Sequence, residues 1–199
     1  MANRPEKISE EEIHENPWWS YKHDKYKLPS GEEGDYYYAD TEGGVMVVPV
    51  LPDGKLGLIR QYRYLADKKG IEFPGGQILE NKSPEESARV ELREETGFIA
   101  DGFTQVATFE VAPGFAKDKA HLFLAQVEEQ KQQQLDSSEN IEVLSRRVDE
   151  FQEMITRGDI FHGMTLAAWS LVSPYFERLH EEPREKSPKV KQILDKIFR

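Results

Sequence analysis

The segment from residue 75 to residue 98 constrains the fold of this chain more than any other. It reads GGQILENKSPEESARVELREETGF and joins a glycine pair to a marked helix start and a marked helix stop. Ser83 has the position of an N-cap, Pro84 that of the first helical residue, and Glu86 completes a capping box. Gly97 has the position at which a helix usually ends. The pattern therefore predicts one short helix directly after a glycine loop.

Three carboxylates crowd the end of the expected helix. Glu91, Glu94 and Glu95 share one face, because residues three and four positions apart are neighbours on a helix. Such like-charge pairs cost about 0.2–0.5 kcal/mol each, and acids in the last turn also oppose the helix dipole. A run of charge usually indicates a solvated face. The nearby Gly75–Gly76 pair favours a divalent cation instead, since glycine lets a backbone carbonyl approach and Mg²⁺ or Mn²⁺ prefers hard oxygen ligands.

The composition narrows the class of protein. The chain has 199 residues, no cysteine and a formal net charge of −11. The absence of cysteine excludes a thiol nucleophile and a cysteine metal site, and the negative charge argues against broad binding of nucleic acid. We see no signal peptide and no stretch apolar enough to span a membrane, so we expect a cytoplasmic protein.

Strand and turn patterns dominate the rest of the chain, with two late helices. Residues 1–13 are polar and are expected to be loose. The expected strands cover the ranges 36–38, 44–51, 55–64, 71–76, 104–111, 119–127 and 141–148. The expected later helices cover the ranges 149–158 and 163–180, and residues 189–199 have the pattern of a small amphipathic helix. This order predicts an α/β (α+β) sandwich with mixed strand order.

The segment around the predicted helix resembles the Nudix box of the Nudix hydrolases. The matching positions, counted from Gly76, are Glu91, Leu92, Glu94, Glu95, Gly97 and Phe98. Lys82 and Val90 depart from the box, in which these two positions commonly form an acid–base pair that supports the helix. Either another side chain such as Arg89 or Arg93 has taken over this support, or the chain is a catalytically impaired binding module.

The resemblance extends over roughly residues 15 to 175 and points to the ADP-ribose pyrophosphatase branch. The matching stretches include VPVLPDGKLGLIRQYRY, EFPGGQ and APGFAKDKAHLFLAQ. Pro113 stands fifteen positions after Phe98 (113 − 98), the spacing that marks ADP-ribose hydrolysers in this family. GDP-mannose hydrolases share much of the pattern, so other nucleotide sugars stay open. An RNA-processing Nudix protein is disfavoured by the net charge and by the Pro113 spacing.

The resemblance implies a Nudix α/β/α sandwich with a mixed sheet and an N-terminal β subdomain. It divides the chain into an N-terminal extension at 1–40, a Nudix domain at 41–182 and a tail at 183–199. In this branch the N-terminal strands usually join two copies into a homodimer. The implied reaction is metal-dependent hydrolysis of a nucleoside diphosphate sugar, with ADP-ribose giving AMP and ribose 5-phosphate.

The resemblance also implies the site residues. The metal ligands, for Mg²⁺ or Mn²⁺, would be the carbonyl of Gly75 and the side chains of Glu91, Glu94 and Glu95. The catalytic residues would be Glu91, Glu95 and Glu139, with Glu139 as general base and Glu142 or Glu91 as alternatives. The substrate contacts would be Arg63, Glu72, Pro113, Gly114 and Phe115. Alternatively, Arg63 is a solvated strand residue without a role in binding. His162 is only a weak candidate for any role.

Overall fold

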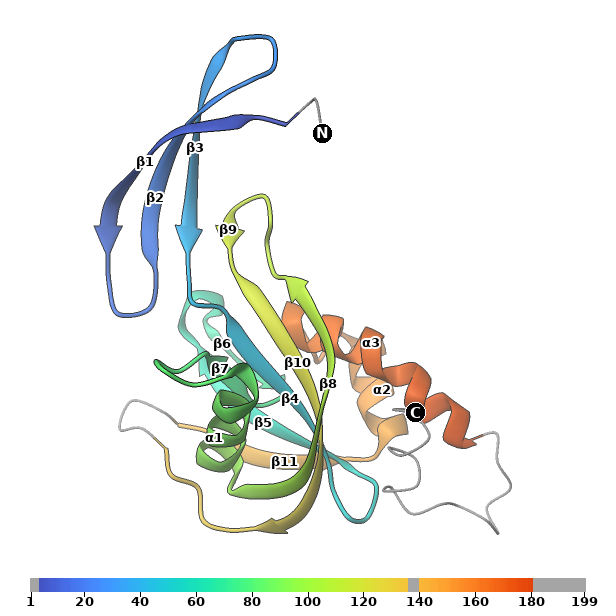
Figure 1. Cartoon of the computed structure of the whole chain (residues 1–199). Helices are drawn as coiled ribbons and strands as arrows, with labels where there is room; N and C mark the ends of the chain where they lie inside the picture. The colour runs from blue at the N-terminus through green and yellow to red at the C-terminus, as the bar shows by residue number, and fades with distance from the viewer. Residues whose placement is uncertain (1–3, 136–139, 181–199) are drawn as a thin grey trace. The chain divides into compact units, whose positions relative to one another are not determined.

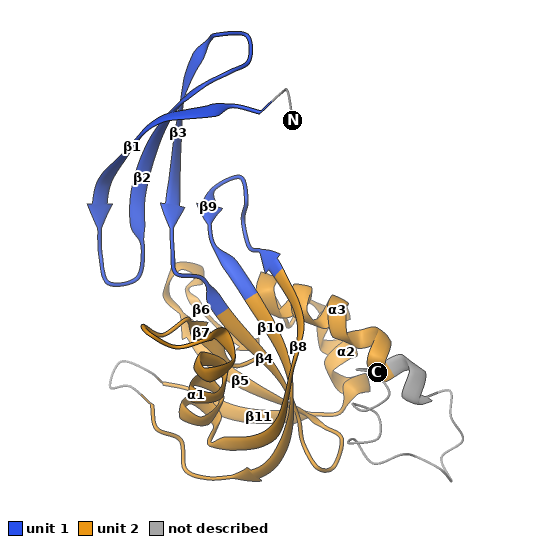
Figure 2. Cartoon of the chain, viewed as in Figure 1, with its two compact units in different colours: residues 1–44, 109–120 blue, residues 45–108, 121–199 orange. Residues whose placement is uncertain are grey.

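The computed structural model describes residues 4–135 and 140–180, which belong to two compact units (Figures 1 and 2). Unit 1 comprises residues 1–44 and 109–120, and unit 2 comprises residues 45–108 and 121–199. The tail at 183–199, with its predicted amphipathic helix, lies outside the described residues, as does Glu139. No helix in the described part of the chain is long and apolar enough to cross a membrane.

Unit 1 is built on a four-stranded sheet in the order β1-β2-β3-β9. Its strands are β1 (Glu6–Glu15), β2 (Ser20–Lys27), β3 (Glu33–Asp40) and the short β9 (Ala116–Lys117). The first three strands run antiparallel to their neighbours, while β9 runs parallel to β3. On this sheet the rings of His23 and Tyr37 stack with centroids 4.4 Å apart. Side-chain pairs of this kind across neighbouring strands stabilise a sheet.

The expectation that residues 1–13 are loose is wrong, because Glu6–Glu15 forms strand β1. All ten side chains of β1 are exposed, so no apolar alternation marks the strand in the sequence. Its pairing with β2 is supported by an ion pair between Lys7 and Asp24, 2.7 Å apart, and by a longer one between Glu10 and Lys22. These partners are distant in sequence, so the local pattern could not reveal them.

Unit 2 contains a mixed sheet and all three described helices. The main path of the sheet runs β11-β5-β4-β10-β8, with β6 paired to β5 and β7 paired to β4. The strands of this sheet, which at residues 44, 109–110 and 119–120 belong to unit 1, are β4 (Gly44–Val50), β5 (Leu56–Arg63), β6 (Lys68–Glu72), β7 (Gly75–Gln77), β8 (Phe98–Glu110), β10 (Lys119–Gln130) and β11 (Glu142–Arg146). The helices are α1 (Pro84–Thr96), α2 (Val148–Arg157) and α3 (Gly163–His180), and a 3₁₀ turn covers Tyr64–Ala66.

Strand β4 is buried on both of its faces, which explains its nearly continuous run of apolar residues. Val45 and Val47 pack with Ala88 and Leu92 of α1 in one core. Side chains alternate along a strand, so the residues between them point to the opposite face, where α2 and α3 lie (Figure 1). There a chain of aromatic contacts joins Phe73, Phe151, Trp169 and Phe176. The predicted α/β/α sandwich is therefore confirmed.

Two expected strands differ most from the observed ones. Strand β8 begins at Phe98, directly after α1, and not at residue 104. Strand β8 pairs with β10, and Phe98 and Ala100 bury their side chains in the α1 core. The strand expected at 71–76 is split into β6 and β7 at Pro74, which has no N–H for a strand ladder.

Candidate active site

Helix α1 begins and ends where the sequence predicts. The hydroxyl of Ser83 accepts a hydrogen bond from the backbone N–H of Glu86, and the carboxylate of Glu86 accepts one from the N–H of Ser83 over 2.8 Å. Gly97 ends the helix with φ 72°, in the left-handed region that favours glycine. These contacts fix the register of α1 and hence the direction of its glutamates.

Two glutamates of α1 face the glycine pair of strand β7. The N–H of Gly75 donates a hydrogen bond to Oε2 of Glu95 over 2.8 Å, and Glu95 is buried. The carboxylate of Glu91 lies so close to Gly76 that a Cβ at Gly76 would stand 2.7 Å from Oε2 of Glu91. A Cβ at Gly75 would overlap the carbonyl oxygen of Val45. Both glycines are therefore required for the close approach of backbone and carboxylates.

The C-terminal end of α1 is held by Gln130, the last residue of β10, and by the polar segment that follows it. The side chain of Gln133 donates to the carbonyl of Glu95, and that of Gln130 donates to the carbonyl of Thr96. The last carbonyls of a helix have no partner within the helix, so these amides satisfy them. Backbone hydrogen bonds from Lys131 and Gln134 add to the same anchor. The glutamine run therefore fixes the end of α1 that carries the site carboxylates.

Arg89 holds the middle of α1 against strand β8. Its guanidinium donates to Glu85 one turn earlier and to the carbonyl of Ala100 over 3.1 Å, and it lies over the ring of Phe103. Val90, one of the two positions that depart from the Nudix box, is half-buried beside it. Arg93, the other candidate support, donates to the side chain of Gln134. Arg89 thus supports α1 from the position next to Val90, where the Nudix box has its supporting arginine.

The predicted metal ligands are close in space but are not gathered into a finished cluster. In the part of the chain that the structure describes, no three histidine, aspartate or glutamate side chains converge as metal ligands. Glu91 and Glu95 both turn toward Gly75–Gly76, whereas Glu94 is exposed. The donor set, two carboxylates beside a glycine backbone with a third on the same helix, is of the hard oxygen type that suits a divalent cation. The residues fit such an ion, and their assignment as its ligands stays a prediction.

Arg63 and Glu72, both predicted as substrate contacts, form an ion pair with each other. Nε of Arg63 donates to Oε1 of Glu72 over 2.9 Å, and Nη2 donates to Oε2. Glu72 is fully buried, while the side chain of Arg63 is 42% exposed. These hydrogen bonds raise the pKa of Arg63. Burial of an unpaired carboxylate costs several kcal/mol. The guanidinium of Arg63 is therefore held in place by the carboxylate of Glu72.

His162 and Thr165 complete this ion pair, although the sequence gives His162 only weak weight and Thr165 none. Nδ1 of His162 lies 3.2 Å from Oε2 of Glu72 and 3.0 Å from Oγ1 of Thr165. Thr165, in the first turn of α3, also accepts a hydrogen bond from the N–H of Phe73. Burial lowers the pKa of His162, which favours the neutral ring. The only sequence signal is the short spacing of the two residues at the start of α3.

The remaining predicted site residues are divided between the units. Pro113, Gly114 and Phe115 lie in unit 1, in the turn between β8 and β9, where the hydroxyl of Tyr36 donates to the carbonyl of Gly114. Phe115 is 70% exposed, and the role of these three residues as substrate contacts stays a prediction. Glu142, the alternative base, pairs in unit 2 with Arg60 on the neighbouring strand β5.

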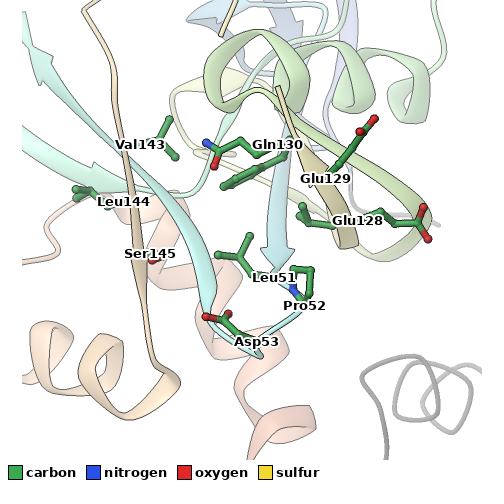
Figure 3. A pocket seen from close by; sticks show the side chains of 11 residues that line it. Leu51, Pro52, Asp53, Glu128, Glu129, Gln130, Val143, Leu144 and Ser145 are labelled. Carbon is green, nitrogen blue, oxygen red and sulfur yellow. The ribbon is translucent and has the colours of Figure 1, made fainter. Parts of the chain in front are cut away.

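A separate hollow of ≈ 420 Å³ lies at the other end of strand β4, at its turn into β5 (Figure 3). Figure 3 labels Leu51, Asp53, Glu129, Gln130 and Val143 among the side chains that line it. Its described lining residues include none of the predicted site residues. The predicted site at Gly75–Gly76 therefore lies apart from this hollow, and its assignment stays a prediction.

The fold and the site together define a hydrolase of the Nudix class. The family model of the NUDIX domain matches residues 40–167, which is more than half of the chain. The chain therefore belongs to the NUDIX domain family. It is a Nudix hydrolase that resembles the ADP-ribose pyrophosphatases.

Individual proteins are also similar to this chain. The ADP-ribose pyrophosphatase of Bacillus subtilis is 30% identical over 145 residues, which cover 71% of this chain and 78% of the relative. The methanol dehydrogenase activator of Bacillus methanolicus is 28% identical over 147 residues, covering 73% and 80%. A crystal structure of an ADP compounds hydrolase has a TM-score of 0.77 and 22% identity, and the match covers 87% of this chain and 95% of that one. The last likeness supports the fold alone.

Proposed function

We propose that this protein hydrolyses the pyrophosphate bond of a nucleoside diphosphate sugar, with ADP-ribose as first substrate and AMP and ribose 5-phosphate as products. The observation that carries the proposal is the approach of Glu91 and Glu95 of α1 to Gly75–Gly76. Similarity to an ADP-ribose pyrophosphatase supports the choice of sugar nucleotide. A methanol dehydrogenase activator matches the chain at nearly the same identity, so the substrate is tested directly with a panel of nucleotides.

In the proposed site Glu91, Glu94, Glu95 and the carbonyl of Gly75 hold Mg²⁺ or Mn²⁺. When bound, such an ion neutralises pyrophosphate charge and lowers the pKa of a coordinated water. The hydrogen bond from Gly75 keeps the carboxylate of Glu95 turned toward the glycine loop. Arg63 binds a phosphate oxygen through the edge of its guanidinium that faces away from Glu72. Glu139 is the proposed general base that accepts a proton from the attacking water, with Glu142 or Glu91 as alternatives.

We also propose that the strands of unit 1 join two copies of the chain. Several large apolar or aromatic side chains on this unit are exposed, among them Trp18 at 65%, Trp19 at 43% and Tyr37 at 52%. Exposed groups of this kind are enriched where proteins bind one another. Sedimentation equilibrium would test this proposal, with Trp18→Ser expected to shift the chain toward a monomer. A wild-type mass equal to that of a single chain would contradict it.

The function is tested by product release from a panel of substrates. The panel contains ADP-ribose, GDP-mannose, UDP-glucose, NADH and a diadenosine polyphosphate, each assayed with Mg²⁺, with Mn²⁺ and with EDTA. Metal-dependent release of AMP from ADP-ribose is the expected result. A preference for another member of the panel would keep the chemistry and change the substrate. Binding of these nucleotides without turnover would identify a catalytically impaired module instead.

A further inference from the structure

The carboxylate of Glu72 is surrounded by partners from three parts of unit 2. Arg63 of β5 donates two hydrogen bonds to it, and His162, just before α3, lies 3.2 Å from its Oε2 atom. Strand β6, which carries Glu72, makes room for the carboxylate at Gly70, where a Cβ would stand 2.7 Å from Oε1. Glu72 itself is fully buried. In this structure the carboxylate is therefore held by protein groups, and the role of Glu72 as a substrate contact stays a prediction.

This enclosure gives Glu72 a second role, through Arg63. The guanidinium of Arg63 is planar and carries five N–H donors in a rigid fork. The edge with Nε and Nη2 faces Glu72, so the edge with Nη1 is directed away from it, and the side chain is partly exposed. Glu72 therefore determines the direction in which Arg63 can bind an anion.

The position of Glu72 depends in turn on His162. A carboxylate only accepts hydrogen bonds, so the Nδ1–H tautomer of His162 is the one that contacts Glu72. Oγ1 of Thr165 lies 3.0 Å from the same nitrogen and accepts from the N–H of Phe73, the residue after Glu72. The start of α3 thus holds both the side chain of Glu72 and the backbone that follows it.

We propose that His162 is a positioning residue, which holds Glu72 and through it directs the guanidinium of Arg63 toward the phosphate oxygens of the substrate. The identity of the anion rests on the proposed function, whereas the connection from His162 to Arg63 does not. Thr165 supports the same nitrogen of His162. The network couples α3 to a binding group on β5, although neither His162 nor Glu72 is required to touch the substrate.

The connection is tested without substrate through the side-chain Nε–H of Arg63. A guanidinium held by a buried carboxylate should give a slowly exchanging ¹⁵N–¹H signal, which Arg63→Lys identifies by its loss. We expect the signal in the wild type and in His162→Asn, whose amide nitrogen can replace Nδ1, and its loss in His162→Ala. His121→Ala is the matched control, since His121 is a partly buried histidine of unit 2 that contacts Gln105 and not Glu72.

Kinetics with ADP-ribose and Mg²⁺ test the consequence. His162→Ala should raise KM about tenfold, the size expected for a lost hydrogen bond to a charged group, with little change in kcat. His162→Asn should restore most of the affinity. In an Arg63→Ala background His162→Ala should have no further effect, because His162 acts through Arg63. If His162 had only a structural role, His162→Ala would lower kcat and the melting temperature both with Arg63 present and in the Arg63→Ala background.

The two proposals fail in different ways. Persistence of the Arg63 signal in His162→Ala, its absence from the wild type, or an undiminished effect of His162→Ala in the Arg63→Ala background would overturn the positioning role. A wild type that hydrolyses no nucleotide, while the Arg63 signal still depends on His162, would overturn only the proposed function. If His162→Ala does not fold, Thr165→Val takes its place with the same expectations.

Discussion

The backbone N–H of Gly75 donates a hydrogen bond to Oε2 of Glu95, 20 positions later in the chain, over 2.8 Å. This contact ties the glycine loop to the last turn of α1, the part of the helix with the greatest repulsion between carboxylates. Glu95 therefore has two roles in the proposed site. It holds the N–H of Gly75, and in our proposal it also supplies negative charge for a cation.

Glu95→Gln should separate the two roles. The amide oxygen of glutamine can still accept from Gly75, so we expect the free energy of unfolding to stay within about 1 kcal/mol of wild type. The lost charge should lower kcat/KM at least about 100-fold, since a bound cation contributes several kcal/mol of charge stabilisation. Urea unfolding and ADP-ribose hydrolysis measure the two effects. Activity near that of the wild type would remove Glu95 from the set of metal ligands.

The two neighbouring glycines should respond differently to alanine. A Cβ at Gly75 meets the backbone of Val45 and Met46, which cannot move away easily, so Gly75→Ala should lower stability by about 1–3 kcal/mol. The three atoms nearest to a Cβ at Gly76 all belong to the side-chain end of Glu91. Gly76→Ala should therefore keep most of the stability and lose activity, as the carboxylate of Glu91 is displaced. Thermal unfolding and kcat measurements of the pair check this, and equal melting temperatures would contradict it.

The features predicted correctly from the sequence are those that depend on nearby residues. The cap at Ser83, the stop at Gly97 and the common face of Glu91 and Glu95 all follow from spacings of three to four positions. Strand β1 and the contacts of His162 could not be predicted in this way. They depend on partners such as Asp24 for Lys7 and Glu72 for His162, which only the folded chain brings close.

Ser83→Ala should shorten or loosen the start of α1. The hydroxyl of Ser83 accepts from the N–H of Glu86, and loss of such an N-cap costs about 1 kcal/mol. Because the glutamates of the site lie at the other end of the helix, we expect a lower stability with nearly unchanged KM. Chemical unfolding and steady-state kinetics check both statements. Ser83→Asp, which retains a capping oxygen, is the control and should stay close to wild type.

The capping box also makes the stability of the protein depend on pH. Hydrogen bonds from the backbone N–H and the hydroxyl of Ser83 hold the pKa of Glu86 below its ordinary value. A lowered pKa in the folded state stabilises the protein at pH values above the ordinary glutamate pKa, and this contribution is lost as the pH falls through the lowered value. Ser83→Ala removes the hydroxyl but keeps the N–H. The stability difference between Ser83→Ala and wild type should thus shrink, without vanishing, on acidification, and a difference independent of pH would contradict this.

Gly70→Ala should disturb the ion pair of Arg63 and Glu72 without replacing either residue. The new Cβ would stand 2.7 Å from Oε1 of Glu72 and 3.1 Å from the ring of Phe161, so the buried carboxylate would have to shift away from the guanidinium. We expect a loss of about 1–3 kcal/mol in the free energy of unfolding, the cost of crowding a packed interior, together with a higher KM for ADP-ribose.

Gly163→Ala provides the comparison for Gly70→Ala. Gly163 is the first residue of α3, has ordinary backbone angles, and a Cβ there meets nothing within 4 Å. Alanine at this position should leave KM unchanged and should stabilise the protein by up to about 1 kcal/mol, because alanine restricts the unfolded chain and favours helix. Urea unfolding and kinetics of both variants measure the contrast. Only the Cβ at position 70 can move the carboxylate of Glu72, so only Gly70→Ala should raise KM. An unchanged KM in Gly70→Ala would show that the fit of Glu72 beside Gly70 does not control Arg63.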